Sequence, residues 1–549
     1  MKTKKQTKFV FVTGGVVSGL GKGITAASIG KLLTSRGFLV NMQKCDQYLN
    51  SDAGTLNPAE HGEVFVTKDG AETDLDLGHY ERFIDYEMTR DSSTMQGDVY
   101  STVIENERKG MYLGKTVQII PHITTEIQRR ILKSAEGKDV HIVEVGGTVG
   151  DYESLAYTEA IRQLKHKVGE ENALYIHVVF VPYLEASKEL KTKPAQNSVR
   201  DLREVGILPD ILCVRSDHQL NEDVIEKLSL FCDVEPQAIV QMTTAKTVYE
   251  VPLMMEAQGI GDYITEQLGL GQPKPQLDEW RDLVARIKGV KNQVKIGVVA
   301  KYLNHEDTYM SVFEALKSAG WYHDSRVEIA WIDAEKLEQS LDPLHDVDGI
   351  VVPGGFGNRG VEGKILAAQY AREHDLPYLG LCLGMQIAVI EYARNVLGLA
   401  GANSTEMDPD TKYPVIDLMP DQKGVQMGGT MRLGNYDTAI AKDTRSCLVY
   451  GSERAVERHR HRYEFNNEYR DQLRKAGLCI AATSPNKKLV EMVEITKHPF
   501  YIASQFHPEF LSRPDRPHPL FRDFVGAAKR RSVHAVSQKS MMDGKYESN

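Results

Sequence analysis

Two short stretches of this sequence contain residues that could do chemistry. The first is SGLGKG at residues 18–23, and the second is GLCLG at residues 380–384. A glycine-rich run that ends in a lysine is typical of a phosphate-binding loop, and a cysteine between glycines is typical of a nucleophile on a sharp turn. The 549-residue chain therefore indicates two chemistries in separate parts of the sequence.

The interpretation of residues 18–23 as a phosphate loop depends on their context. They stand between a strand-like run, KFVFVTGG, and a helical pattern from about Gly23 to Arg36. Loop amides and the positive end of a helix can bind phosphate oxygens, while Lys22 adds a mobile cation. The match to GxxxxGK[ST] is imperfect, because Val16 replaces the first glycine and Gly23 the hydroxyl residue. A tight turn without a ligand is the alternative.

Two carboxylates are candidate magnesium ligands. Glu144 ends the strand-like run DVHIVEVGG, and Asp76 lies in ETDLDLGHYERF. A carboxylate at the C-terminal end of a parallel strand faces the crevice where such sheets bind ligands. Mg²⁺ takes one or two carboxylates together with phosphate oxygens. The alternative is that Asp74 and Asp76 are solvated loop acids.

A basic segment, EASKELKTKPAQNSVRDL, follows later in the same half of the chain. Lys191, Lys193 and Gln196 surround Pro194 in a predicted turn. A restrained turn with two lysines could form a second anion pocket, whereas a run of charges is more often a solvated face. The residues themselves leave both interpretations open.

Cys382 has the setting of a nucleophile elbow. Gly380 and Gly384 leave room for a strained turn between a strand and a helix, and the start of a helix favours a thiolate. The amides of VVPGGFGNRG, residues 351–360, can join the Leu383 N–H in stabilising a tetrahedral oxyanion.

The segment YIASQFHPEF supplies the partners of this cysteine. Residues two apart in an extended segment share one side, so Glu509 can orient His507 while His507 acts as a base towards Cys382. We expect a Cys–His–Glu triad. The alternative is a buried structural cysteine with an unrelated histidine.

The elements that must position these residues are strands alternating with helices, in two series. This alternation predicts an α/β fold made of two doubly wound parallel-sheet domains. The first domain is expected at residues 1–272, a linker at 273–293, and the second domain at 294–533. Residues 534–549 are polar and are expected to be a disordered tail.

Composition excludes several classes of protein. Hydrophobic residues make up 41% and charged residues 26%, as in ordinary globular enzymes, and no apolar run approaches the ~18 residues of a membrane span. The N-terminus lacks the pattern of a secretory signal, so we expect a cytoplasmic location and no membrane contact. A net charge of −10 without a basic stripe argues against nucleic acid as a partner. Six cysteines without a CxxC pair indicate neither a disulfide framework nor a zinc site.

The motifs of the second half resemble those of class I glutamine amidotransferases, which release ammonia from glutamine. The resemblance lies in PGGFG, GLCLGMQ and FHPEF. It implies that Cys382, His507 and Glu509 are catalytic. It also implies a glutamine site formed by Gly355, Leu383, Gly384, Met385, Gln386, Glu406 and Arg462.

The whole pattern resembles the CTP synthase family, to about residue 530. The further motifs that carry this resemblance are GGVVSGLGKG, DLDLGHYERF, EVGGTVGDYES and KTKPAQNS. It implies an amidoligase (synthetase) domain that uses ATP to phosphorylate the uracil 4-oxygen of UTP, after which ammonia displaces phosphate to give CTP. Lys22 and Lys44 would assist phosphoryl transfer, and Mg²⁺ would lie on Asp76 and Glu144. ATP would bind to Gly19, Leu20, Gly21, Lys22, Gly23, Ile24 and Asp76.

The same resemblance implies regulation. UTP and the inhibitory product CTP would bind to Ser18, Asp151, Tyr152, Glu153, Lys191, Thr192, Lys193, Pro194, Ala195, Gln196 and Lys227, where the family often has threonine at Ala195. GTP would activate through a segment that includes Arg359, and the assembly would be a homotetramer.

Two alternatives remain at this stage. One is a cobyrinate-type amidotransferase that activates a carboxylate, against which KTKPAQNS and DLDLGHYERF argue. The other is a phosphate-loop switch or scaffold with a sensory glutaminase domain.

Overall fold

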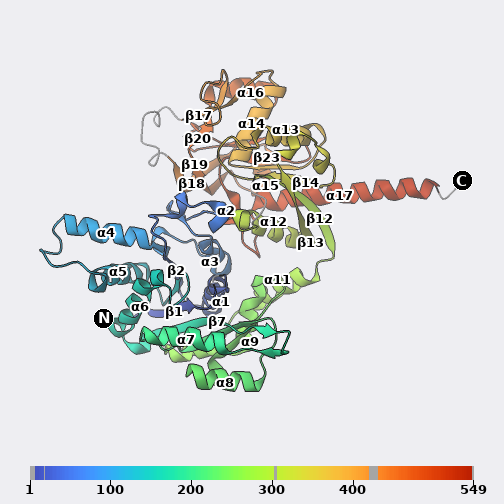
Figure 1. The fold of residues 1–549 in the computed structure, drawn as a ribbon. Coiled ribbons are helices and arrows are strands. Elements are labelled where there is room, and N and C mark those ends of the chain that lie inside the picture. The colour runs from blue at the N-terminus through green and yellow to red at the C-terminus, as the bar shows by residue number, and fades with distance from the viewer. Residues whose placement is uncertain (1–5, 18, 302–305, 419–430, 547–549) are drawn as a thin grey trace. The chain divides into compact units, whose positions relative to one another are not determined.

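The computed structural model describes residues 6–17, 19–301, 306–418 and 431–546 (Figure 1). The chain divides into two compact units, each described here by itself. The first consists of Met1–Leu56 and Glu72–Lys288, and the second of Asn57–Ala71 and Gly289–Asn549. None of the helices in these described ranges combines the length and the apolar character needed to cross a membrane.

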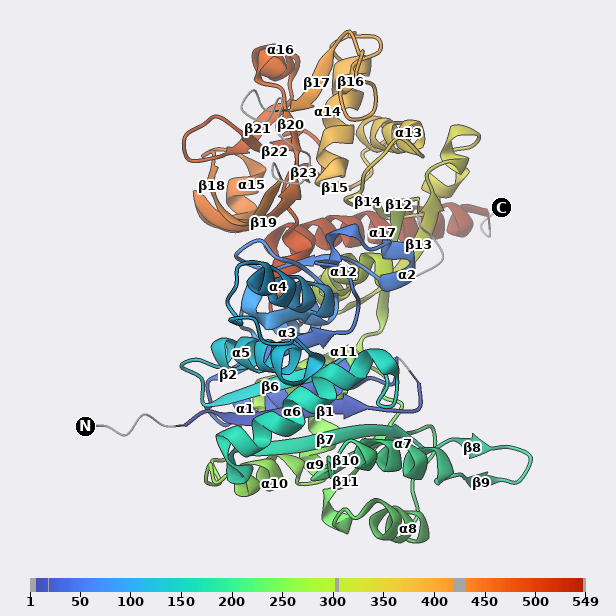
Figure 2. The same ribbon diagram turned by 60° about the vertical axis from the view of Figure 1, so that its left-hand side comes forward.

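The first unit is built on a seven-stranded parallel sheet with the order β11-β10-β7-β1-β6-β2-β5 (Figures 1 and 2). Its strands are rich in Val, Ile and Phe and are almost wholly buried, as expected when helices cover both faces. The strands are β1 (Lys8–Gly14), β2 (Val40–Asp46), β5 (Ser93–Met95), β6 (Val140–Val145), β7 (Ala173–Phe180), β10 (Ile211–Ser216) and β11 (Ile239–Thr243).

Helices cover this sheet on both faces. Phe9 and Phe11 of β1 share one hydrophobic cluster with α5 and α6, and the intervening Val10 points to the opposite face. The helices are α1 (Lys22–Thr34), α3 (Asp76–Ile84), α4 (Gln96–Arg108), α5 (Thr124–Ser134), α6 (Leu155–Val168), α7 (Lys193–Glu204), α8 (Glu222–Cys232), α9 (Val251–Ala257), α10 (Ile260–Gln267) and α11 (Asp278–Gly289). Short strands add β4 (Glu72–Thr73), β8 (Tyr183–Leu184) and β9 (Glu189–Leu190).

The second unit contains a nine-stranded sheet with the order β13-β12-β14-β15-β23-β22-β21-β18-β19. The strands from β13 to β23 in this order are parallel, and antiparallel pairing begins at β22. Their bounds are β12 (Asn292–Ala300), β13 (Ser325–Asp333), β14 (Gly349–Val352), β15 (Tyr378–Leu381), β18 (Arg432–Ile440), β19 (Arg454–His461), β21 (Cys479–Thr483), β22 (Val490–Glu494) and β23 (Tyr501–Ser504).

Two hydrophobic clusters lie in this second unit. One is formed largely with α13 and α14, the other with α12 and α17. The helices are α2 (Pro58–His61), α12 (Met310–Tyr322), α13 (Val361–Glu373), α14 (Leu383–Asn395), α15 (Arg445–Tyr450), α16 (Arg470–Ala476) and α17 (Pro519–Tyr546). A small sheet contains β16 (Asn403–Ser404), β17 (Pro414–Leu418) and β20 (Tyr463–Phe465), and β3 (Phe65–Val66) completes the list.

The predicted α/β fold class is confirmed, but three predicted boundaries differ from the structure. Residues 57–71 group with the second unit, because their contacts with it are long-range and leave no local pattern in the sequence. The predicted linker 273–293 contains α11, whose apolar residues Trp280, Leu283 and Val284 are buried. The predicted disordered tail is helical as far as Tyr546 in α17, over a segment without proline that includes the helix formers Ala, Gln, Lys and Met.

Candidate functional site

The phosphate loop follows β1 and leads into α1. Gly19 and Gly21 have φ of 73° and 96°, a left-handed conformation that glycine adopts without strain. A Cβ on Gly23 would lie 2.1 Å from Asp76 Oδ1, which explains why the usual hydroxyl residue is missing there. Lys22 is buried and donates to the Gly147 carbonyl at 2.7 Å, and burial lowers its pKa. Ser18 lies outside the described residues.

Carboxylates and a lysine meet beside this loop. Lys44, on β2, contacts Asp76 Oδ2 and lies 3.0 Å from Glu144 Oε1, and Tyr80 donates to the other Glu144 oxygen. Burial alone would lower the pKa of Lys44, but Asp76 and Glu144 raise it well above its usual value. Burial would raise the pKa of Asp76, but the charge of Lys44 has the larger effect and lowers it. The structure thus brings together Lys22, Lys44, Asp76 and Glu144.

Asp46 is a residue of this cluster that the sequence reasoning missed. It is the last residue of β2, and its Oδ1 lies 3.9 Å from Lys44 Nζ. Its Oδ2 is buried and has no hydrogen-bond partner within the described ranges. Burial, with Asp76 and Glu144 nearby, raises its pKa to about 6 against the effect of Lys44. The sequence position of Asp46 could have indicated it, because Asp46 ends a parallel strand and Glu144 lies one residue before the end of another.

The donor set of this cluster fits Mg²⁺. Asp46, Asp76 and Glu144 supply only hard oxygen atoms, which Mg²⁺ prefers, and Asp46 Oδ2 is an orphaned acceptor. Among the described residues, no group of three or more His, Cys, Asp or Glu side chains is arranged to hold a metal ion by itself. Mg²⁺ commonly takes one or two protein carboxylates and completes its shell with phosphate oxygens and water.

The basic segment forms the start of α7. Lys193 and Pro194 are its first two residues, Thr192 and Gln196 are joined by a 3.0 Å hydrogen bond, and Ala195 is fully buried. Lys191 pairs with Glu189 and is the main cause of the lowered pKa of that carboxyl. The charge of Lys227 makes a smaller contribution in the same direction.

The loop at Asp151–Glu153 approaches α7 through Gly150, where a Cβ would lie 3.7 Å from Asp201. Tyr152 in this loop is 91% exposed. The two segments of the predicted UTP site are therefore neighbours.

Cys382 stands on a strained turn between β15 and α14. Its φ of 50° is in the left-handed region, which is costly for a residue with a side chain. Its amide donates to Ser504 O at 2.7 Å, which ties the turn to the neighbouring strand β23. A Cβ on Gly384 would lie 2.1 Å from the Val352 carbonyl, so the first turn of α14 requires glycine there. This is the geometry expected of a nucleophile elbow.

His507 and Glu509 follow β23, the strand beside β15. His507 Nδ1 lies 2.7 Å from Glu509 Oε1, and both residues are buried. Burial would lower the pKa of His507, but Glu509 and Cys382 raise it to about 10. Nε2 of His507 is buried without a hydrogen bond in the described structure. The structure brings the three predicted triad residues together, since Gly354 lies against both His507 and Cys382.

The residues predicted to hold glutamine surround the elbow. A Cβ on Gly354 would lie 3.7 Å from Cys382 Cβ, and one on Gly355 would lie 3.4 Å from the Leu383 side chain. Glu406 accepts a hydrogen bond from Gly357 N at 3.4 Å. Burial raises the pKa of Glu406, although the positive charges of Arg462 and Lys301 lower it in part.

Two further predicted glutamine contacts lie on α14. Gln386 has a buried Oε1 without a partner in the described ranges. Met385 is fully buried in the hydrophobic cluster, so only its backbone can reach a ligand.

The strand β19 contacts the triad through its main chain. The Arg458 carbonyl accepts from His507 N at 2.7 Å, and the Arg460 carbonyl lies 3.7 Å from Cys382 Sγ. Two buried side chains of this strand, His459 and His461, are hydrogen-bonded to each other at 2.8 Å. No pattern in the sequence predicts this pair, since histidines in HRHRYEF also suit a solvated strand.

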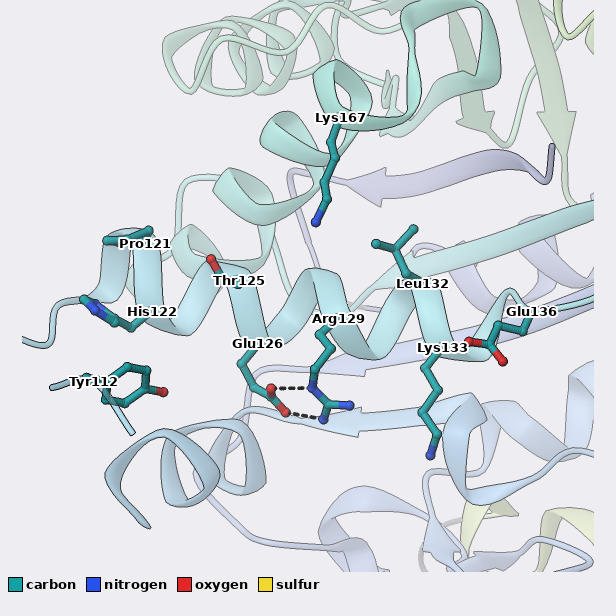
Figure 3. A pocket seen from close by; sticks show the side chains of 10 residues that line it. All are labelled: Tyr112, Pro121, His122, Thr125, Glu126, Arg129, Leu132, Lys133, Glu136 and Lys167. Carbon is teal, nitrogen blue, oxygen red and sulfur yellow. Dashed lines mark hydrogen bonds and ion pairs between the residues drawn. The ribbon is translucent and has the colours of Figure 1, made fainter. Parts of the chain in front are cut away.

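A cavity of about 530 Å³ is lined largely by α5, with Lys167 from α6 (Figure 3). Its lining combines Arg129, Lys133 and Lys167 with Glu126 and Glu136. Glu126 is already paired with Arg129 at 2.7 Å, and Lys133 with Asp91 at 2.8 Å. These pairs already engage Glu126, Arg129 and Lys133, and we assign the cavity no part in the reaction.

Comparison with known proteins agrees with this geometry. The family model described as CTP synthase N-terminus matches residues 8–270, and that described as glutamine amidotransferase class-I matches residues 305–527. The CTP synthase of Carboxydothermus hydrogenoformans is 58% identical over 527 residues, which cover 95% of this chain and 98% of that protein. The chain belongs to the CTP synthase family. The predicted resemblance is thereby confirmed.

A second curated CTP synthase gives the same result. The CTP synthase of Moorella thermoacetica is 56% identical, over 96% of this chain and 98% of its own. The solved glutaminase domain of Trypanosoma brucei CTPS with bound acivicin is 43% identical and covers 43% of this chain and 94% of its own, with a TM-score of 0.42. Neither the cobyrinate-type enzyme nor the switch or scaffold is favoured by the two family models and the two CTP synthase relatives.

Proposed function

We propose that this chain forms CTP from UTP, with ATP as the energy source and glutamine as the source of ammonia. The observation that carries the proposal is that one chain combines a Cys382–His507–Glu509 triad with a lysine and carboxylate cluster at a phosphate loop. A nitrogen source and a phosphoryl-transfer site are the two parts that such an amination needs. The chain is then a ligase that forms a C–N bond.

The glutaminase half acts through covalent catalysis. Sulfur of Cys382 attacks the side-chain amide carbon of glutamine, a C–S bond forms, and the carbonyl electron pair moves to oxygen. The amides of Leu383 and Gly355 receive this oxyanion. The C–N bond then breaks, and ammonia leaves with the proton of His507. Water hydrolyses the thioester to glutamate.

Glutamine is positioned by groups around the elbow. Glu406 suits its ammonium group and Arg462 its carboxylate, while Gln386, Gly384 and Met385 line the start of α14. The charge pattern matches an amino acid, whose two charged groups are close together.

The synthetase half converts a poor leaving group into a good one. The uracil 4-oxygen attacks the γ-phosphorus of ATP, the bond to ADP breaks, and ammonia later displaces phosphate at carbon 4. Lys22 and Lys44 stabilise the transferred charge. Asp76 and Glu144, with Asp46, would hold Mg²⁺, which when bound neutralises phosphate charge. Gly19 to Ile24 cradle the phosphates of ATP.

The nucleotide that is aminated would bind beside α7. Lys191, Lys193 and Lys227 provide positive charge for its triphosphate, and Thr192 to Gln196 form the start of α7 that supports it. Asp151, Tyr152 and Glu153 would distinguish the base, with Ser18 completing the set, and CTP would compete there as inhibitor. Buried Ala195 offers no hydroxyl contact.

Three further features belong to the proposal. A homotetramer is supported by exposed apolar side chains on the first unit, such as Leu113 at 89%, Met111 at 67% and Ile119 at 52%. GTP would activate through the segment around Arg359. The cytoplasm, which supplies ATP, UTP and glutamine, is the proposed location.

The experiment supplies the purified chain with ATP, Mg²⁺, UTP and either glutamine or ammonium chloride, and measures CTP. Wild-type protein should form CTP from both. Cys382→Ala should lose essentially all glutamine-supported synthesis and keep ammonium-supported synthesis, because only the ammonia supply needs the thiol. An equal loss of both in a folded variant would contradict the division of labour.

A further inference from the structure

Lys364 is a buried cation in the first turn of α13. It is 1% exposed, and its amide donates to Gly360 O at 3.2 Å. The N-terminal end of a helix carries partial positive charge, which disfavours a cation there. No hydrogen bond or ion pair of its ammonium is found within the described ranges of the chain. A buried, unpaired lysine is costly, and the catalytic residues assigned above leave it unexplained.

The ammonium of Lys364 lies against the loop expected to stabilise the oxyanion. A Cβ on Gly355 would be 3.9 Å from Lys364 Nζ. A Cβ on the preceding Gly354 would be 2.8 Å from His507 Cε1 and 3.7 Å from Cys382 Cβ. The pair Gly354–Gly355 therefore contacts both the triad and the lysine, which places the ammonium on the order of 10 Å from the reacting sulfur, given ~3.8 Å between successive Cα atoms.

The charged groups near Lys364 do not neutralise it. Burial, followed by the charge of Lys301, lowers its pKa to about 7. Lys301 itself donates to the Phe356 carbonyl, and Arg359 donates to the Lys301 carbonyl at 3.0 Å. Glu406, from a later segment of the chain, accepts from Gly357 N of this loop. Burial and Arg359 lower the pKa of Lys301, and Glu406 acts against them. Lys364 is left without a countercharge until a negative charge develops nearby.

We propose that Lys364 is a positioning residue of the glutaminase reaction, whose ammonium supports the Gly354–Gly355 loop and favours the tetrahedral oxyanion over bound glutamine. The inference rests on the proposed function. The oxyanion exists only after the C–S bond has formed and disappears when the C–N bond breaks. A charge that acts on it should change kcat and leave the KM for glutamine almost unaltered.

The test compares Lys364→Met with wild-type protein in the full-length chain. Methionine keeps a long apolar side chain and removes the charge. We expect the kcat of glutamine hydrolysis to fall about 10-fold. This is roughly the effect of removing a unit charge that interacts with the oxyanion over this distance at an effective dielectric of about 20. The KM for glutamine should change less than about twofold, and CTP formation from ammonium chloride should be unchanged.

The pH profile separates this role from a structural one. Lys364 is protonated below its pKa, so the ratio of wild-type to Lys364→Met rates should be largest below pH 7 and approach one as the pH rises beyond about 8. Lys364→Arg stays protonated throughout this range and should keep its rate at alkaline pH. Lys475→Met, at an exposed lysine of the same unit, should match wild type.

Three outcomes would overturn the inference: an unchanged kcat in Lys364→Met, a ratio that does not vary with pH, or an alkaline decline of Lys364→Arg equal to that of wild type. If Lys364→Met does not fold, the Lys364→Arg profile alone decides the question. Wild-type protein that fails to hydrolyse glutamine would instead contradict the proposed function.

Discussion

At the scale of single residues, the synthetase site is defined by side chains that are costly to bury. Lys44 compensates Asp76 and Glu144, whereas Asp46 keeps an oxygen without a partner in the described structure. A buried acceptor that is left open in this way is expected where a cation or a donor from a ligand completes the site. The residue most in need of a test is therefore the one that the motifs did not indicate.

We predict that Asp46→Asn raises the Mg²⁺ concentration needed for CTP formation from ammonium chloride by about 10- to 100-fold, the usual effect of losing a supporting carboxylate. Because the pKa of Asp46 is about 6, protonation should also raise the wild-type requirement as the pH falls below 6, and the variant should lack this dependence. Magnesium titrations at several pH values measure both effects. Asp91→Asn, at an exposed carboxylate paired with Lys133, is the control. A wild-type magnesium requirement in Asp46→Asn would exclude this role.

At the scale of elements, three adjacent strands and their loops build the glutaminase site. The loop after β14 carries the oxyanion amides, the turn after β15 carries Cys382, and β23 leads to His507 and Glu509. A fourth strand, β19, fixes the backbone of the triad through its carbonyls. Its position depends on the pair His459–His461 and on Arg432, which lies 3.0 Å from Glu491 and 3.2 Å from Glu464.

We predict that His461→Leu lowers glutaminase kcat about 10-fold, because a small displacement of β19 misplaces His507 relative to Cys382. Burial keeps the pKa of His461 well below its usual value, so the imidazole acts as a neutral hydrogen-bond partner. His461→Gln, which can still accept from His459, should recover much of the rate. Glutamine hydrolysis is compared with ammonium-supported synthesis, which should not change. Equal rates for the leucine and glutamine variants would show that the hydrogen bond is not what positions the strand.

At the scale of the whole molecule, residues 57–71 interrupt the first unit in the sequence but belong to the second unit. Within this unit, Ser311 N donates to Glu63 Oε2 at 2.8 Å, and Arg458 donates to Val66 O at 3.0 Å. Phe65 is fully buried, with its ring 5.0 Å from that of Phe510. Residues 57–71 are thus part of the core of the glutaminase unit.

We predict that Phe65→Ala lowers the free energy of unfolding of the glutaminase unit by about 3–5 kcal/mol, the usual cost of removing a buried phenylalanine. Urea unfolding followed by the loss of glutamine hydrolysis measures this change. Leu448→Ala, at a side chain that is 85% exposed in the same unit, should change stability by less than about 0.5 kcal/mol. An effect of Phe65→Ala as small as that of the control would mean that the segment contributes little to the core.

The sequence by itself determined the local parts of this protein. Glycine spacing predicted the phosphate loop and the nucleophile elbow, because a left-handed φ or a close backbone approach restricts the residue type at a single position. The prediction that Glu509 orients His507 agrees with their 2.7 Å contact, but the expected extended segment is wrong, because Glu509 lies in the 3-10 turn Pro508–Leu511. Alternating strands and helices predicted the confirmed α/β fold.

Tertiary structure alone decided what depends on strand order and burial. Asp46 joins Glu144 because β2 and β6 are neighbours in the sheet, although β2 and β6 are separated by 93 residues in the chain. Residues 57–71 join the second unit through contacts with distant parts of the chain. Lys364 lies only nine residues after Gly355, but its burial beside that glycine is set by the packing of the folded chain. Side-chain periodicity reports which face of an element is buried, but not which other element covers it, and the cost of burying a charge is fixed only by that partner.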